Sequence, residues 1–240
     1  MEFSVICVYN DKSKMEKYLE KSLAGQVGIT YEKIFIDNTT NKYENAKVAL
    51  CEAVKNANGK YYLFVHQDIE LQSNETFKKL YEILENNKDF GIAGVAGKLG
   101  ENIYSNITHG KDRTKASNYN LEDVKEVETV DECLFVIKRD TYEKYSFENL
   151  TCNSWHLYSV EYSLFIKQVG KKVIVLPIEL YHASRGFIDN TYFKQLTKLV
   201  SIYKIGRKKI NTTVSNWYTN PILLKMQIWK TKWARNKSLK

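Results

Sequence analysis

The 240-residue sequence has few prolines and few cysteines, and its last 51 residues contain no acidic side chain. Two prolines argue against a string of domains joined by proline-rich linkers. The four cysteines are far apart and form no CxxC pair, so neither a zinc site nor a redox pair is expected. We expect free thiols in a reducing cytoplasm. An apolar content of 43% excludes a disordered or collagen-like chain.

The chain also lacks long apolar runs. Its first residues, MEFSVICVYN, contain no basic segment followed by a long apolar one, so no secretory signal is expected. No stretch approaches the run of about 18 apolar residues that predicts a membrane-spanning helix. These absences predict a cytoplasmic protein, either free or bound peripherally to the inner face of the membrane.

The charge that is present is unevenly distributed. The formal net charge is +8, from 36 Lys and Arg and 28 Asp and Glu. Residues 190–240 hold 12 of the basic residues and none of the acidic ones, which leaves residues 1–189 with a net charge of −4. We therefore predict two parts, a mildly acidic body (residues 1–189) and a basic extension (residues 190–240).

Short apolar runs alternate with helical stripes through the body. The predicted strands cover residues 3–8, 33–37, 61–65, 91–96 and 172–176, with a strand pair in 127–137. Helices are predicted at 13–25, 46–57, 74–86 and 158–169. This alternation predicts an α/β fold with a mainly parallel central sheet flanked by helices. Residues 100–120 are polar and aperiodic, so we expect a mobile loop there, with His109 in it.

The extension predicts amphipathic helices. The apolar residues of the first are Phe193, Leu196, Leu199, Val200 and Tyr203, and those of the second are Ile222, Met226, Trp229 and Trp233. Lysines and arginines surround both stripes, a pattern that suits an anionic membrane surface. The alternatives are helices packed on the body or on a second copy of the chain. No nucleic acid is expected as a partner, because no nucleic-acid-binding motif is present and the basic residues avoid the body.

Two polar residues follow the apolar strand at 61–65. His66 and Asp68 are two residues apart, which places their side chains on the same side of an extended chain. An imidazole and a carboxylate in this arrangement can share a divalent cation. Asp37 ends another strand, and ligands of such sheets bind at the carboxyl ends of the strands. This edge is therefore the predicted ligand site, and ordinary polar strand ends are the alternative.

The order of the motifs resembles the nucleotide-sugar half of a family 2 glycosyltransferase with the GT-A fold. In that family the first strand is followed by Tyr-Asn, matched by Tyr9-Asn10, and the second ends in an Asp, matched by Asp37. The third leads into a metal-binding Asp-x-Asp, in whose place this chain has His66-Gln67-Asp68, a variant that occurs in a bacterial subgroup. The resemblance covers residues 3–186 and implies that residues 1–189 are the catalytic domain.

The resemblance also implies roles for single residues. Donor nucleotide contacts are expected from Val8, Tyr9, Asn10, Asp37, Asn38 and His66. A divalent cation, Mn²⁺ or Mg²⁺, is expected at Asp68 and His182. The segment Trp155-His156-Leu157-Tyr158 and the following Glu161 resemble the family's motif before its general base, so Glu161 is the expected base and Asp131 the second choice. Glu132, Trp155 and His156 are expected to contact the sugar or the acceptor.

The activity that the resemblance implies is an inverting sugar transfer. The donor is a nucleoside-diphosphate sugar, with a UDP-sugar favoured, and the acceptor is a hydroxyl of a saccharide or a lipid-linked compound. The expected setting is bacterial surface polysaccharide or glycoconjugate synthesis. One alternative is a non-catalytic relative that binds a nucleotide-sugar or a carbohydrate. A nucleotidyltransferase is disfavoured, because Val8-Tyr9-Asn10 stands where such enzymes have a glycine-rich phosphate loop.

Overall fold

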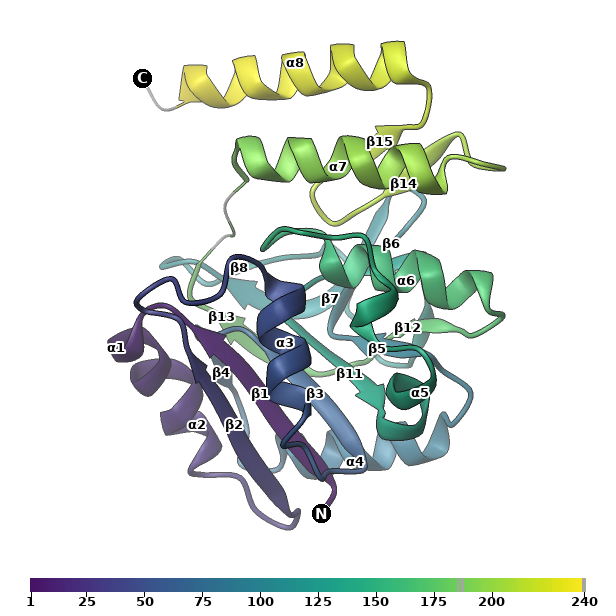
Figure 1. Ribbon diagram of the computed structural model, residues 1–240. Coiled ribbons are helices and arrows are strands. Elements are labelled where there is room, and N and C mark those ends of the chain that lie inside the picture. Colours follow the sequence, from purple (N-terminus) through teal and green to yellow (C-terminus); the bar gives the residue numbers. More distant parts are fainter. Residues whose placement is uncertain (185, 187, 239–240) are drawn as a thin grey trace.

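The computed structural model describes residues 1–184, 186 and 188–238, and Figure 1 shows the arrangement of their elements. A central seven-stranded sheet has the strand order β2-β1-β3-β11-β5-β12-β9. Five of these strands, β2, β1, β3, β5 and β12, run in the same direction, which confirms the predicted α/β fold with a mainly parallel sheet. The strands are β1 (Phe3–Tyr9), β2 (Tyr31–Asp37), β3 (Tyr61–Val65), β5 (Ile92–Gly94), β9 (Lys125–Glu126), β11 (Leu134–Lys138) and β12 (Val173–Val175).

Helices cover both faces of the central sheet, because its inner strands carry apolar side chains on both sides. In β1, Phe3, Val5 and Cys7 pack into one core cluster and Ile6 into the other. The first face is covered by α1 (Lys12–Met15), the π-helix η1 (Glu16–Glu20), α2 (Lys21–Leu23) and α4 (Thr76–Asn86). The second is covered by α3 (Ala46–Val54), α5 (Arg139–Lys144), the 3-10 helix η2 (Phe147–Asn149) and α6 (Tyr158–Gln168).

A close backbone approach fixes the turn that leads into β3. The backbone N–H of Gly59 donates a hydrogen bond to Ser4 Oγ at 2.7 Å. A Cβ atom on Gly59 would lie 2.3 Å from the backbone nitrogen of Ser4. Only glycine lets the chain pass this close to β1, and the turn therefore sets the pairing of β1 with β3.

A second sheet has the strand order β10-β6-β7-β13-β4, and β8 pairs with β7. Its strands are β4 (Ile69–Leu71), β6 (Ala96–Leu99), β7 (Asn102–His109), β8 (Thr114–Lys115), β10 (Thr129–Val130) and β13 (Glu179–His182). The mobile loop predicted at residues 100–120 is therefore wrong. Of the residues in β7 only Ser105 and Ile107 are buried, so the strand has little apolar periodicity, but its backbone pairs with β6 and β13.

The extension forms a layer on the body. It consists of α7 (Asn190–Tyr203), the hairpin β14 (Lys209–Asn211) and β15 (Asn216–Tyr218), and α8 (Pro221–Ser238). The predicted apolar stripe of α7 is buried in a third core cluster that includes Val160 and Leu164 of α6. The sequence did not predict the hairpin. In Figure 1, α8 lies beyond α7 on the side away from the central sheet. Within the described residues no helix has both the length and the apolar content that crossing a bilayer requires.

Candidate active site

A cavity of about 840 Å³ lies at the carboxyl ends of β1 and β3. This is the edge at which parallel α/β sheets bind ligands. Two predicted site residues, Asp37 and Glu161, are not part of its lining. The others are, namely Val8, Tyr9, Asn10, Asn38, His66, Asp68, Asp131, Glu132, Trp155, His156 and His182. The structure thus brings together residues that are far apart in the sequence.

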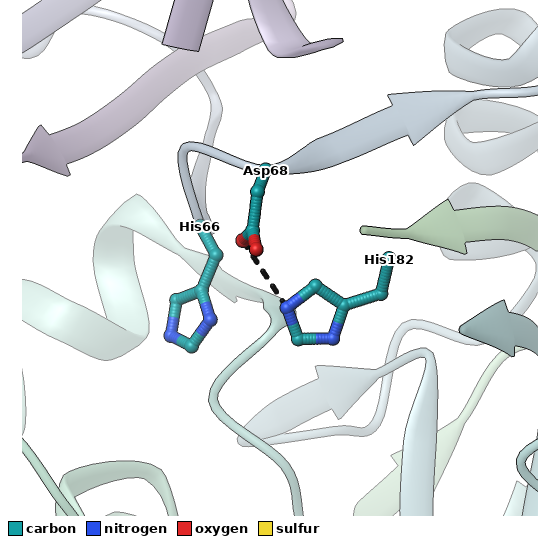
Figure 2. A group of neighbouring side chains, drawn as sticks. All are labelled: His66, Asp68 and His182. Atoms are coloured by element: carbon teal, nitrogen blue, oxygen red, sulfur yellow. Dashed lines mark hydrogen bonds and ion pairs between the residues drawn. The ribbon is translucent and has the colours of Figure 1, made fainter. Parts of the chain in front are cut away.

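Three side chains in the cavity form a cluster of potential metal ligands, His66, Asp68 and His182 (Figure 2). His66 and Asp68 lie in the turn between β3 and β4, and His182 ends β13, which pairs with β4. One ligand atom from each lies within 4.8 Å of the others, and His182 Nε2 is 3.2 Å from Asp68 Oδ1. Two imidazoles and a carboxylate suit a divalent transition metal. Of the two expected cations, the donor set therefore fits Mn²⁺ better than Mg²⁺, which prefers oxygen ligands.

The electrostatics of this cluster agree with ligation. Burial lowers the pKa of His66 to about 4, and the nearby His182 shifts it in the same direction, so His66 is neutral at pH 7 and keeps a lone pair. For Asp68, burial alone raises the pKa, but the hydrogen bond and charge of His182 outweigh it and hold that pKa well below its usual range. The ionised carboxylate of Asp68 and the neutral imidazole of His66 therefore both offer lone pairs to a cation.

Gln67, between the two ligands, joins the ends of β1 and β3. Its Oε1 accepts hydrogen bonds from the backbone N–H groups of Asn10 and Asp11, each at 3.0 Å. Its Nε2 donates to Asn10 Oδ1 at 2.7 Å. Gln67 therefore fixes the Tyr9-Asn10 turn beside the metal ligands. No role was predicted for Gln67, although its place between His66 and Asp68 in the motif was a signal.

Asp37 and Asn38 end β2 in different environments. Asn38 is buried, and its amide is engaged with the backbone of Tyr43, accepting at 2.8 Å and donating at 3.3 Å. Asn38 therefore shapes the loop up to Tyr43 and also lines the cavity. Asp37 is exposed outside the lining, and its Oδ1 accepts from the N–H and the hydroxyl of Thr39. These bonds from Thr39 lower the pKa of Asp37.

Asp131 lies between β10 and β11 and is held at both oxygens. Its Oδ1 accepts from the backbone N–H of Cys133 at 3.0 Å. Its Oδ2 accepts from Thr213 Oγ1 at 2.5 Å. Thr213 belongs to the β14–β15 hairpin, so the extension orients a carboxylate of the body. Short bonds to a carboxylate are strong and directional, and they fix its position in the cavity.

Glu132, next to Asp131, has a strongly raised pKa. Burial, followed by the charge of Asp131, raises the pKa of Glu132 to about 8. Its Oε1 has no hydrogen-bond partner within the part of the chain that the structure describes. At neutral pH Glu132 is therefore mostly protonated.

Glu161, the expected general base, is fully buried in α6 and does not reach the cavity. Its Oε1 accepts from the N–H and the hydroxyl of Thr151, both at 2.7 Å. In this structure Glu161 therefore holds Thr151, in the segment before α6, against that helix. The expectation that Glu161 meets the acceptor hydroxyl has no support from this geometry, whereas Asp131, the second choice, lies in the cavity.

Trp155 and His156 line the cavity on the side of the extension. Trp155 is 38% exposed, which leaves one part of its indole open to a ligand. His156 Nε2 is 3.5 Å from Asp189 Oδ1. Burial lowers the pKa of His156, and the charge of Asp189 partly offsets this. The next residue, Leu157, has φ of 67°, a conformation that costs a leucine about 1 kcal/mol or more and turns the chain into α6.

Several cavity residues were missed because nothing local in the sequence marks them. The extension contributes Tyr192, Thr213, Val214 and Arg235, and the body contributes residues such as Lys14. Since the cavity is closed by a layer that the sequence placed apart from the body, its walls follow only from the three-dimensional packing. His109, expected in a loop, lines the cavity from the end of β7.

Comparison with solved structures shows the fold. The chain superposes on GalNAc-T7, solved with UDP, GalNAc and Mn²⁺, with a TM-score of 0.61 at 14% identity over 85% of this chain. It superposes on S. aureus TarS 1–349, in complex with UDP-GlcNAc, with a TM-score of 0.56 at 16% identity over 84%. For the mannosyltransferase PcManGT from Pyrobaculum calidifontis, in complex with GDP-Man and Mn²⁺, the TM-score is 0.57 at 12% identity over 86%.

These likenesses confirm the GT-A fold that the sequence predicted. The chain spans 48% of GalNAc-T7, 66% of the TarS chain and 65% of PcManGT. No curated protein matches it by sequence. Residues 4–198 match the family described as "Glycosyltransferase like family", a range that covers nearly all of the central sheet, the cavity residues of the body and most of α7. The chain therefore belongs to this glycosyltransferase-like family.

Proposed function

We propose that the protein is a metal-dependent, inverting glycosyltransferase that moves a hexose or a related sugar from a nucleoside-diphosphate sugar to a hydroxyl acceptor. The observation that carries this proposal is the meeting of His66, Asp68 and His182 with the oriented carboxylate of Asp131 in one cavity. A bound cation would stabilise the charge of the leaving diphosphate, and a carboxylate can take the proton of the attacking hydroxyl. These are the two needs of a direct sugar transfer.

The metal would be held by Asp68 and His182, with His66 as the third ligand. When bound, Mn²⁺ or Mg²⁺ neutralises the charge that develops on the leaving diphosphate. Ser184 Oγ lies 3.2 Å from His182 Nε2, the same nitrogen that faces Asp68, and so stands beside the proposed site of the cation. The donor nucleotide would lie along Val8, Tyr9 and Asn10, with Asp37 and Asn38 at the rim.

Asp131 would act as the general base. Its carboxylate takes the proton of the acceptor hydroxyl while the hydroxyl oxygen forms a bond to the anomeric carbon. The bond between that carbon and the diphosphate oxygen breaks, and the diphosphate leaves with the electron pair. One displacement of this kind inverts the configuration. A positioned base contributes on the order of 10²–10⁴-fold. Glu132, Trp155 and His156 would contact the sugar or the acceptor.

The proposed donor is a UDP-sugar, and the proposed setting is surface polysaccharide or glycoconjugate synthesis in the cytoplasm of a bacterium. Two of the three reported structural neighbours were solved with UDP or a UDP-sugar, which supports a UDP-sugar as donor. The resemblance of His66-Gln67-Asp68 to a bacterial subgroup supports a role in surface polysaccharide or glycoconjugate synthesis. Four free cysteines suit a reducing cytoplasm.

The test is release of nucleoside diphosphate from a panel of UDP- and GDP-sugars with Mn²⁺ or Mg²⁺. We expect Asp68→Asn and Asp131→Asn each to lower the rate at least about 100-fold. Asp123→Asn is the matched control, because Asp123 is exposed and lies outside the cavity. If both cavity variants turned over as fast as the control, the assignment of the site would be wrong.

A non-catalytic relative that binds nucleotide-sugars is the second candidate. The burial of Glu161 supports it, because the residue expected to be the base does not line the cavity. In that case a UDP-sugar with Mn²⁺ would raise the melting temperature of the protein, but no nucleoside diphosphate would be released over any acceptor tested. Release that depends on Asp131 decides for the enzyme.

A further inference from the structure

The outer face of α8 exposes a row of large apolar side chains. Ile222 is 70% exposed, Met226 52%, Trp229 65% and Trp233 59%. Their spacings of 4, 3 and 4 keep them on one narrow strip of the helix. The comparable apolar stripe of α7 is buried against the body. The two helices have similar apolar patterns, but only the stripe of α8 is exposed.

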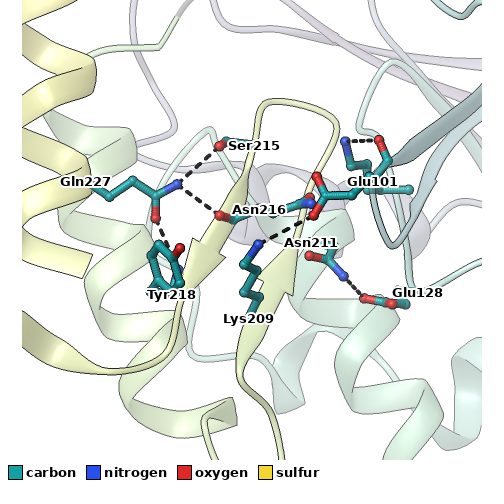
Figure 3. A network of polar contacts seen from close by, with 9 residues as sticks. Glu101, Glu128, Lys209, Asn211, Ser215, Asn216, Tyr218 and Gln227 are labelled. Carbon is teal, nitrogen blue, oxygen red and sulfur yellow. Dashed lines mark hydrogen bonds and ion pairs between the residues drawn. The ribbon is translucent and has the colours of Figure 1, made fainter. Parts of the chain in front are cut away.

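The opposite face of α8 is fixed to the protein. Leu224 is buried in the third core cluster, and Gln227 binds the hairpin. Its Nε2 donates to the carbonyl of Asn216 at 2.9 Å, and its Oε1 accepts from the N–H of Tyr218 at 3.1 Å (Figure 3). The hairpin is bound to the body in turn, because Asn211 donates to Glu128 (Figure 3). The exposed strip is therefore held rigidly with respect to the cavity.

The surroundings of the strip are uniformly basic. By helical periodicity Lys225 and Lys230 flank it on either side, and both are exposed. A groove of about 530 Å³ lies between α7 and α8, and no acidic residue lines it. Four lysines do, namely Lys194, Lys204, Lys225 and Lys232. Tryptophan, aliphatic side chains and lysine together are the composition of helices that lie in the interface of an anionic bilayer.

A second copy of the chain fits this surface less well. In a symmetric dimer the same patch would face itself. The basic side chains beside the two strips would then repel one another, since no acidic residue follows Asp189 in the sequence. An anionic lipid surface instead supplies the opposite charge and an apolar layer for the tryptophans at once.

We propose that α8 docks on the surface of an anionic lipid bilayer through Ile222, Met226, Trp229 and Trp233. Arg235 of the same helix lines the cavity of the body. Docking therefore brings this wall of the cavity towards the membrane, where a lipid-linked acceptor presents its saccharide. This last step rests on the proposed function, whereas the docking itself does not.

The experiment is sedimentation of the full chain with phosphatidylcholine vesicles, with or without about 30% phosphatidylserine. We expect about tenfold or more binding to the anionic vesicles over the neutral ones, and a decline with salt. Met226→Ser with Trp229→Ser removes apolar contact, and Lys225→Glu with Lys230→Glu removes charge. Each pair should lower binding about tenfold.

The controls change the same kinds of residue on the body. Val27→Ser with Val48→Ser alters two exposed apolar side chains, and Lys79→Glu with Lys88→Glu makes the same change in net charge. Both should bind like the wild type. Equal binding of the wild type to neutral and anionic vesicles overturns the proposal. The proposal is also overturned if analytical ultracentrifugation shows that the wild type is a dimer and that the α8 variants are monomers.

Release of nucleoside diphosphate with a soluble acceptor separates this proposal from the proposed function. The α8 variants should keep that activity, because none of the four substituted residues lines the cavity. If the wild type binds anionic vesicles but releases no nucleoside diphosphate, the proposed function fails and the docking surface stands. If it releases nucleoside diphosphate without binding vesicles, the reverse holds.

Discussion

Replacing Glu132 by glutamine is expected to stabilise the protein, and to do so more strongly as the pH rises. Burial and then the charge of Asp131 raise the pKa of Glu132 from 4.5 to about 8. Between these two values the folded protein keeps a proton that the unfolded chain releases, so the free energy of unfolding falls as the pH rises. Above pH 8 both states are ionised and the loss is complete. Glutamine has the same shape and does not titrate.

The magnitude follows from the difference between the two pKa values. The rise of the pKa from 4.5 to about 8 corresponds to about 5 kcal/mol of the free energy of unfolding, because each tenfold change in proton affinity is about 1.4 kcal/mol. The Glu132 side chain as a whole is half-buried although its Oε1 is buried, so solvent in the cavity screens part of its charge and reduces this figure. We expect Glu132→Gln to raise the free energy of unfolding by about 2–3 kcal/mol at pH 9 and by little at pH 5.

Urea denaturation of the wild type and the variant at five pH values between about 5 and 9 measures this difference. Glu122→Gln, at an exposed position of the body, is the control and should follow the wild type throughout. A difference that does not grow with pH would refute the raised pKa. A variant less stable than the wild type at pH 9 would show that a neighbouring group stabilises the ionised carboxylate.

Three further predictions concern the cation, the base and the fold. Mn²⁺ at a hundredfold excess over its Kd should stabilise the wild type by about 2.7 kcal/mol, and Asp68→Asn should abolish the corresponding rise in melting temperature while Asp123→Asn keeps it. Thr213→Val removes the bond to Asp131 Oδ2 and should lower kcat about tenfold with little change in the KM of the donor, whereas Thr213→Ser should retain activity. Gly59→Ala should destabilise the protein by about 1–3 kcal/mol in urea denaturation, since its Cβ would meet the backbone of Ser4; an unchanged midpoint would contradict the close approach.

Local sequence signals predicted most of the central sheet and two of the three potential metal ligands, His66 and Asp68. The buried strands β1 and β3 are continuous apolar runs, and such runs identify the inner strands of a parallel sheet. His66 and Asp68 were visible because they follow β3 directly. His182 joined them only through the family resemblance, since its distance in sequence from Asp68 carries no structural signal by itself.

Other features depend on tertiary contacts that no local pattern records. β7 reads as a polar loop because its pairing with β6 and β13 is made by the backbone, which every sequence possesses. The motif placed Glu161 at the site, but its carboxylate turns to Thr151 inside α6. Thr213 lies in a basic segment that the charge pattern separated from the body, and only the packing of the hairpin shows that it contacts Asp131.

The contact between Thr213 and Asp131 has a consequence for how the protein is made. A chain is synthesised from its N-terminus, and its earlier parts begin to fold while later ones are still being added. The Tyr9-Asn10 turn and β3 can assemble early, but Asp68 meets His182 only after β13 exists, and Asp131 meets Thr213 later still. A growing chain therefore presents the nucleotide side of the cavity first, and the cavity is complete only when the hairpin docks.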